Sequence, residues 1–145
     1  MHFSPKSLGP KVNLTDVVLL CASICGIAIA YIADTQLFKF MEKNESLKGR
    51  NLEAVPLLRT GLWKYSRHPN YFGEQLWWWS VAMCSLRMGQ SWTMVGQLFN
   101  FLCMFHVKDL TEERIMKSDR KKIYEEYKRV TSGWVPLPPK KVSND

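Results

Sequence analysis

The 145-residue sequence lacks the glycine-rich motifs with which soluble nucleotide-binding folds hold phosphate groups. Neither GxGxxG nor GxxxxGKS/T occurs among its eight glycines, which excludes a Rossmann-type domain and a P-loop. The sequence also has no CxxC pair and no histidine at a zinc-ligand spacing. Its four cysteines all lie in apolar stretches, so we expect buried free thiols, with neither a disulfide nor a zinc site.

Charge is strongly biased toward the positive sign. The formal net charge is +7, and lysine and arginine cluster outside the apolar stretches. Such a balance suits nucleic acid, anionic lipid or a phosphorylated cofactor about equally well, so charge alone identifies no partner. Hydrophobic residues make up 46% of the chain although the mean hydropathy is −0.19, which means that they are gathered into blocks. The length fits a single domain over residues 1–145.

The first apolar block runs from Leu14 to Ala33 and has the length of a helix that crosses a hydrocarbon core, about 20 residues. The alternative is a buried helix of a soluble core, but the many small residues in the block favour helix packing in lipid. The preceding segment, residues 1–11, lacks the layout of a cleaved signal peptide. We therefore predict a retained transmembrane helix, followed by a polar connection over residues 34–74. Within this connection, the asparagine, glycine and proline residues of KNESLKGRNLEAVP, residues 43–56, predict a loop.

Two further apolar runs, residues 72–86 and 91–107, are separated by the short segment RMGQ and predict a helical hairpin. Each run is slightly short for a full span, so tilted helices and a re-entrant pair both remain open. Residues 109–130 have the periodicity of an amphipathic helix that the prolines after Trp134 end. The predicted fold is all-α: an integral membrane bundle of about three transmembrane helices with a C-terminal amphipathic helix.

The distribution of basic residues predicts the orientation of this bundle. Seven lysines or arginines lie in residues 34–74 and ten lie from Lys108 onward, against one in the hairpin turn. The positive-inside rule then places the 34–74 connection and the tail on the cytoplasmic side. Trp77, Trp78 and Trp79 point around most of a helix circumference, which is typical of an interfacial aromatic belt, so we expect membrane lipids and no nucleic acid as partners.

The segment GLWKYSRHPNYFGE, residues 61–74, concentrates polar side chains at the mouth of the hairpin. Pro69 should force His68 out of the helical region, and Asn70 is a favoured cap for the helix that follows. A helix N-terminus beside Arg67 would attract a phosphate group. On the residues alone, an equally good interpretation is that Asn70 only caps the helix and Arg67 contacts a lipid headgroup.

Three motifs in one order carry a family resemblance: YIADTQLFKF, GLWKYSRHPNYFGE and ERIMKSDRKKIYEEYKRVTSGWVP. Together they closely resemble an uncharacterised membrane family related to steroid 5α-reductases and sterol reductases, over about residues 31–136. The RHP-containing loop more distantly resembles isoprenylcysteine carboxyl methyltransferases. Full-length relatives are roughly twice this length, so the resemblance also implies that the N-terminal helices lining the substrate pocket are missing here, or that a partner supplies them.

The resemblance implies an NADPH-dependent reduction of a carbon–carbon double bond conjugated with a carbonyl, in a steroid or another lipid. An S-adenosylmethionine-dependent methyltransferase and a non-catalytic membrane interaction protein remain alternatives, and the endoplasmic reticulum is the expected membrane. No catalytic residue is assigned. By matched position the cofactor-binding candidates are Asp34, Asn70, Glu74, Glu113, Arg114 and Tyr127, and the residues that flank these motifs add Arg67, His68, Tyr71, Arg120 and Tyr124. Without the resemblance, Glu113 and Arg114 would pass for a solvated helix face and the tyrosines for packing residues.

Overall fold

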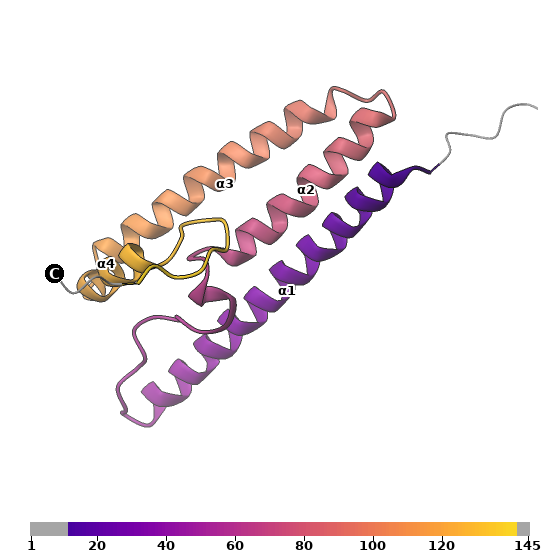
Figure 1. The fold of residues 1–145 in the computed structure, drawn as a ribbon. Coiled ribbons are helices and arrows are strands. Elements are labelled where there is room, and N and C mark those ends of the chain that lie inside the picture. Colours follow the sequence, from indigo (N-terminus) through magenta and orange to yellow (C-terminus); the bar gives the residue numbers. More distant parts are fainter. Residues whose placement is uncertain (1–11, 142–145) are drawn as a thin grey trace, which may run out of the picture.

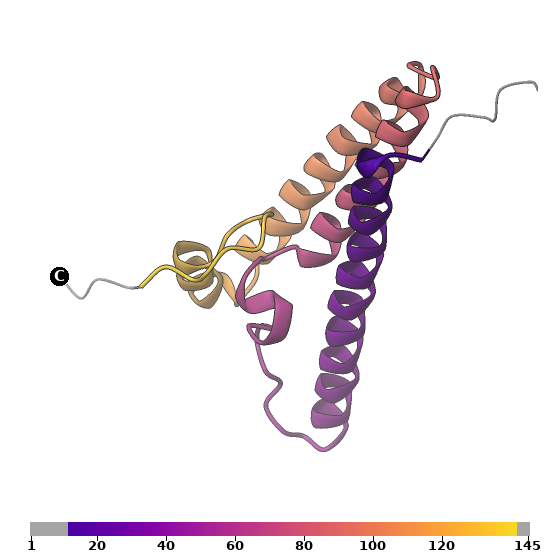
Figure 2. The same cartoon turned by 45° about the vertical axis from the view of Figure 1, so that its right-hand side comes forward.

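A computed structural model describes residues 12–141, and within them it contains only helices and connecting segments. The elements are α1 (Leu14–Gly49), the short 3-10 helix η1 (Gly61–Lys64), α2 (Pro69–Arg87), α3 (Thr93–Met116) and α4 (Lys121–Val130). The three long helices lie side by side with α2 between α1 and α3, and α4 crosses the end of α3 (Figures 1 and 2). The predicted all-α fold class is confirmed. The prediction that no cleaved signal peptide is present concerns residues 1–11, which lie outside the described part.

Helix α1 begins with a complete capping box. The Asn13 side chain accepts a hydrogen bond from the backbone N–H of Asp16 at 3.2 Å, and the Asp16 carboxylate accepts one from the backbone N–H of Asn13 at 2.9 Å. These two bonds satisfy backbone donors that the first helical turn leaves unpaired. The sequence-based start of the helix at Leu14 is therefore confirmed.

The end of α1 was predicted wrongly, because the helix continues from Ala33 to Gly49 instead of giving way to a loop at Asp34. No glycine or proline interrupts residues 34–48, and most of them are good helix formers. Asn44, which suggested a loop, lies on the helix and holds the returning chain through two 2.9 Å hydrogen bonds to the backbone of Val55. The true connection is the shorter stretch of residues 50–60.

Helix α1 is the one helix within residues 12–141 that is long and apolar enough to cross a membrane. Only 11% of its apolar window is buried inside the molecule, whereas the core helix of a soluble protein would be mostly covered. At 1.5 Å per residue the helix is about 54 Å long, well beyond a hydrocarbon core of about 30 Å, so its second part must project from the bilayer. A helical membrane protein is consistent with these features, and the count of three spans remains a prediction.

The predicted hairpin is present as α2 and α3, joined by residues 88–92. Gly89 has a φ of +84°, a conformation that suits glycine and closes the turn. Helix α2 begins at Pro69, whose fixed φ suits the first helical position, and His68 precedes it with φ −139° and ψ 61°. Asn70 is therefore not the cap, as predicted, but a residue of the first turn.

Helices α1 and α2 touch through their backbones at two glycines. A Cβ atom on Gly73 would lie 2.5 Å from the Ala30 nitrogen and 2.6 Å from the Gly26 oxygen, and a Cβ on Gly26 would lie 2.6 Å from the Gly73 oxygen. Small residues on both helices allow this approach, as in helix pairs packed in lipid. The contact fixes α2 against the apolar half of α1.

The predicted amphipathic helix over residues 109–130 is divided in two. Its first part continues α3 to Met116, and α4 begins only at Lys121. Between them, the Ser118 hydroxyl donates to the carbonyl of Ile115 at 2.7 Å and accepts from the backbone N–H of Arg120 at 3.3 Å, which favours a turn over a continuous helix. The break lets α4 bury Tyr124 and Tyr127 against the rest of the molecule.

After α4 the chain returns along the segment that precedes α2. Ser132 pairs with Ser66 in an isolated bridge, and its carbonyl accepts from the backbone N–H of Arg67 at 2.8 Å. The Ser66 hydroxyl donates to the carbonyl of Trp134 at 2.6 Å, and the backbone N–H of Leu137 donates to the carbonyl of Tyr65 at 3.0 Å. The tail is thus part of the structure around residues 65–68.

Candidate functional site

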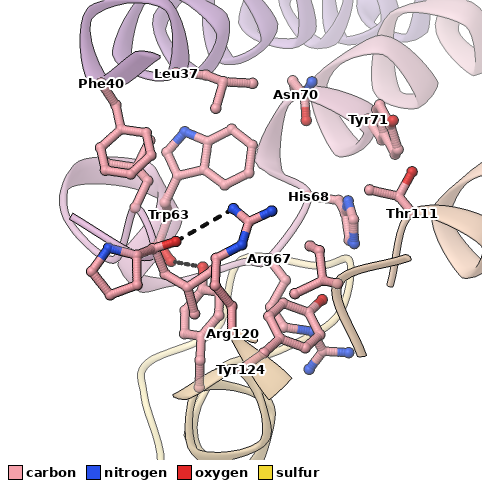
Figure 3. A pocket seen from close by; sticks show the side chains of 15 residues that line it. Leu37, Phe40, Trp63, Arg67, His68, Asn70, Tyr71, Thr111, Arg120 and Tyr124 are labelled. Carbon is pink, nitrogen blue, oxygen red and sulfur yellow. Dashed lines mark hydrogen bonds between the residues drawn. The ribbon is translucent and has the colours of Figure 1, made fainter. Parts of the chain in front are cut away.

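A pocket of about 210 Å³ opens where the projecting part of α1, the segment before α2, the end of α3 and α4 meet (Figure 3). Two loop residues, Leu57 and Leu58, close one side, and the Trp63 and Phe40 rings form an aromatic wall. Seven of the predicted cofactor-binding residues line it: Arg67, His68, Asn70, Tyr71, Arg120, Tyr124 and Tyr127. Motifs far apart in the sequence therefore do converge on one cavity.

The base of the pocket is held by a buried ionic cluster centred on Glu112. Its carboxylate accepts hydrogen bonds from Arg67 Nε and Nη2 at 3.1 and 3.0 Å and contacts His68 Nε2 at 3.1 Å. The side chains of these three residues are only 6–9% exposed. The half-exposed ammonium of Lys128 approaches the other carboxylate oxygen to 3.3 Å. A forked Arg–carboxylate pair is a geometrically specific contact, so the cluster fixes α3 against the segment before α2.

The electrostatic balance in this cluster keeps Glu112 ionised. Burial by itself would raise the pKa of the Glu112 carboxyl, but the hydrogen bond from His68 and the charge and hydrogen bonds of Arg67 outweigh it and hold that pKa well below its usual range. Arg67 is equally committed, because its Nη1 donates to the carbonyls of Thr131 at 2.8 Å and Lys128 at 3.3 Å. Arg67 thus links α3, the end of α4 and the segment before α2, and its guanidinium N–H groups are already used in these hydrogen bonds rather than available to a phosphate group.

Two tyrosines of α4 enter the pocket in different ways. The Tyr127 hydroxyl donates to the carbonyl of Trp63, whose indole N–H in turn donates to the carbonyl of Ala33 at 3.1 Å. The Tyr124 ring is 2% exposed, yet its hydroxyl is buried without a hydrogen-bond partner. Burial raises the pKa of Tyr124 above its ordinary value, so the hydroxyl keeps its proton at neutral pH. Tyr127 thus has a structural partner, whereas the Tyr124 hydroxyl lies near Glu112 and Arg67 without a well-formed hydrogen bond to a residue of the described range 12–141.

Asn70 links the pocket to α1. Its Nδ2 donates to Asp34 Oδ1 at 2.9 Å, while its Oδ1 is buried and accepts no hydrogen bond. A buried polar atom without a partner costs on the order of 1–3 kcal/mol. The pocket therefore contains one unpaired acceptor, on Asn70, and one unpaired donor, on Tyr124. A ligand group that presents both a donor and an acceptor would satisfy the two atoms together.

Four predicted residues do not line the pocket: Asp34, Glu74, Glu113 and Arg114. Asp34 is joined to the pocket by the hydrogen bond that it accepts from the lining residue Asn70. Glu113 and Arg114 are exposed, and the Glu113 carboxylate lies 3.7 Å from the ammonium of Lys117. The predicted convergence of Asp34, Asn70 and Glu113 is thus wrong for Glu113. Consecutive helical residues point about 100° apart, so when Glu112 is buried its successor must face outward. Glu74, the remaining candidate, is half-buried one turn after Asn70 and does not line the pocket either.

The sequence interpretation missed Glu112, Trp63 and Ser66. A signal for Glu112 did exist, since a buried Arg67 requires an acidic partner and Glu112 immediately precedes Glu113, the first residue of the third motif. Nothing in the pattern showed which of the two faces inward. Within residues 12–141 no group of three His, Cys, Asp or Glu side chains is arranged to hold a metal ion. All four cysteines are free, but the expectation that they are buried is wrong: Cys21, Cys25 and Cys103 are exposed, because they lie on helix faces that the rest of the described molecule does not cover.

The fold and site define a helical membrane protein with a polar, aromatic-lined pocket at the end of an apolar helix bundle. Residues 3–131 match the family described as "Protein of unknown function (DUF1295)", and the chain belongs to that family. The family is generally related to steroid 5α-reductase-like membrane proteins. No curated protein matches the chain, and neither does any solved structure.

Proposed function

We propose that the pocket binds the nicotinamide end of NADPH and that the protein belongs to the reductase branch of its relatives, acting on a carbon–carbon double bond conjugated with a carbonyl in a steroid or another lipid. The observation that carries the proposal is that Asn70 and Tyr124 both line this cavity and that each has a buried polar atom, Asn70 Oδ1 and the Tyr124 hydroxyl, without a hydrogen-bond partner among residues 12–141. A carboxamide has an N–H donor for the first and a carbonyl acceptor for the second.

The size and lining of the pocket fit one end of such a cofactor. A volume of about 210 Å³ lies below the roughly 300–1,000 Å³ of complete small-molecule pockets, so an aromatic ring with its carboxamide would enter while the rest of the cofactor extends outward. Trp63, Tyr71 and Phe40 supply aromatic surface for the ring.

The mouth of the pocket offers positive charge for the phosphate groups. Arg120 makes a single 3.5 Å hydrogen bond there, to the carbonyl of Pro56, and its other guanidinium nitrogens remain for a phosphate. Arg120 thus replaces Arg67 as the phosphate ligand we propose.

NADPH would supply the hydride, and the described residues would bind and orient its ring and keep water from it. The Tyr124 hydroxyl, which stays protonated, would fix the carboxamide oxygen, and Asn70 would fix the amide nitrogen while Asp34 orients Asn70. Among residues 12–141 we assign no acid to the substrate carbonyl. Binding of the cofactor and turnover are therefore separate questions.

The proposed orientation places this pocket on the cytoplasmic side of the membrane, with the endoplasmic reticulum as the proposed location. The pocket lies beyond the apolar part of α1, among the basic residues of the connection and tail. Single thiols introduced at Lys48 and Lys140 should react with a membrane-impermeant reagent from one face, and a thiol at Gly89 from the other. Labelling of Lys48 and Lys140 from opposite faces would overturn this topology.

Calorimetric titration of the detergent-purified chain with NADPH and, separately, with S-adenosylmethionine tests the function. We expect NADPH to bind, and we expect bound NADPH to quench the emission of Trp63, with Trp63→Phe as the control for the other five tryptophans. Binding of S-adenosylmethionine alone would favour the methyltransferase, and binding of neither would favour a non-catalytic membrane protein. Turnover assays with steroid and long-chain enones then test catalysis.

A further inference from the structure

A second cavity, of about 410 Å³, lies between α2 and α3 on the other side of the segment that carries His68 and Tyr71. Phe72 and Trp79 line it from α2, Phe101 and Phe105 from α3, and Trp134 from the returning tail. The Trp134 ring stacks on the Phe105 ring with 5.9 Å between their centroids, and its centroid lies 5.8 Å from that of the Phe101 ring. The volume of the cavity falls within the roughly 300–1,000 Å³ typical of small-molecule pockets.

The lining contains no charged side chain and one polar side chain, Gln75. Gln75 is 4% exposed, its Oε1 accepts from Gln97 Nε2 at 2.9 Å, and its Nε2 is buried without any partner. Water held in a cavity needs two to four polar partners, which this lining does not provide. The free donor of Gln75 therefore calls for an uncharged acceptor on an otherwise apolar ligand.

The cavity lies at the depth of the membrane. The backbone contact between Gly26 and Gly73 sets the second turn of α2 beside the apolar part of α1. The α2 residues that line the cavity lie at this contact or follow it: Phe72, Gln75, Leu76 and Trp79. The molecules available at this depth are lipids, and an α-helix of a partner protein, about 10–12 Å across with its side chains, is too bulky for a cavity of this volume.

We propose that this cavity binds the hydrocarbon chain of a membrane lipid that carries an uncharged hydrogen-bond-accepting oxygen, a hydroxyl or carbonyl, which accepts from Gln75 Nε2. The aromatic side chains cover the hydrocarbon chain, and the amide of Gln75 sets where along the chain the oxygen sits. The site is separate from the nicotinamide pocket, shares no lining residue with it, and does not depend on cofactor binding.

The experiment uses a long-chain ketone with a mid-chain diazirine as the photoreactive probe, with the purified full chain in lipid nanodiscs. We expect crosslinks in peptides that contain Trp79 and Phe101. The unlabelled ketone should compete about fivefold better than the alkane of the same length, the advantage expected of one buried hydrogen bond. Crosslinks spread over the exposed face of α1, or equal competition by ketone and alkane, would overturn the proposal.

Matched variants separate the site from general lipid contact. The double variant Gln75→Met/Gln97→Met removes both amides of the hydrogen-bonded pair, so that neither remains buried without its partner. The ketone and the alkane should both still compete with the probe in this variant, but the ketone should no longer compete better than the alkane. Trp79→Ala should reduce crosslinking strongly, whereas Trp78→Ala, an exposed neighbour that does not line this cavity, should leave it unchanged. A ketone advantage that persists in the double variant, or an equal effect of the two tryptophans, would refute the site.

Discussion

Asn70 and Asp34, 36 residues apart in the sequence, join the first turn of α2 to α1 through a 2.9 Å hydrogen bond from Nδ2 to Oδ1. The bond lies just beyond Ala33, where the apolar part of α1 ends. It orients the amide of Asn70 so that its oxygen remains unpaired and buried. The orientation of this one amide is what makes the pocket able to accept a hydrogen bond.

Replacing Asn70 with alanine should weaken NADPH binding about five- to hundredfold, because the cofactor amide would lose its acceptor in a buried site. Arg114→Ala is the matched control: Arg114 is exposed on α3 and away from the pocket, so its loss should leave the affinity unchanged. Calorimetric titration of both variants measures the difference. A larger loss in Arg114→Ala would place the cofactor on the outer face of α3 instead.

The two tyrosines of α4 should respond oppositely to loss of their hydroxyls. Tyr124→Phe removes an unpartnered buried group, so the thermal unfolding temperature should stay the same or rise while NADPH affinity falls. Tyr127→Phe removes the hydrogen bond to the carbonyl of Trp63 and should destabilise the fold by about 1 kcal/mol. Thermal unfolding in detergent, combined with titration, resolves the two. A clear loss of stability in Tyr124→Phe would mean that its hydroxyl is already satisfied.

Glu112→Gln should be strongly destabilising, by about 3–5 kcal/mol, since it leaves the buried guanidinium of Arg67 without a counter-charge. Glu113→Gln changes the adjacent residue in the same way on the exposed side of the helix, and its effect should stay within about 0.5 kcal/mol. Chemical unfolding of both variants in the same detergent provides the comparison. Similar effects of the two substitutions would contradict the inward placement of Glu112.

Acid should destabilise the protein through Glu112. Its folded-state pKa is depressed below the ordinary value of 4.5, so below about pH 5 the unfolded state takes up the proton first. Stability from this group is therefore full above that range and falls as the pH drops toward the folded pKa. The difference in unfolding temperature between wild type and Glu112→Gln should shrink over the same range. If the difference in unfolding temperature did not change with pH, the ionised form of Glu112 would not be the source of the stabilisation, and the packing of its side chain would be.

Gly73→Ala should disrupt the pairing of α1 and α2, because the new Cβ would lie 2.5 Å from the backbone nitrogen of Ala30. Gly96→Ala is the control: among residues 12–141, no atom outside the adjoining backbone of its own helix lies within 4 Å of that Cβ position, and alanine favours a helix over glycine by up to about 1 kcal/mol. We expect a lower unfolding temperature for the first variant and an equal or higher one for the second. Equal tolerance of both substitutions would argue against the close approach of the helices.

The helices were predictable from the sequence where one local signal dominated. The helix start at Leu14, the turn at Gly89 and the exclusion of His68 from the helical region by Pro69 each depend on a few neighbouring residues, and all three predictions were correct. The extension of α1 to Gly49 was missed because Asn44 is compatible with both a helix and a loop. Only its contact with Val55, 11 residues away, settles the choice.

The sequence predicted which segments contribute residues to the pocket, but not which residue of each segment faces inward. Asn70 and Tyr127, both named from the resemblance, line one cavity, whereas Glu113 was chosen where Glu112 is the buried residue. The roles of Arg67 and Tyr124 could not be read from sequence, because they depend on which partners each side chain finds after folding. Arg67 finds Glu112 and two carbonyls, and the Tyr124 hydroxyl finds none.

The bonds between residues 132–137 and residues 65–67 also constrain the order of biogenesis. This tail follows all three long helices in the chain, so α1, α2 and α3 are synthesised while Arg67 still lacks Thr131 and Lys128 as acceptors. The pocket can be completed only once translation has passed Trp134. A chain shortened to end between Met116 and Lys121 would keep the three long helices and lose α4 together with residues 132–137, so it could not form the pocket.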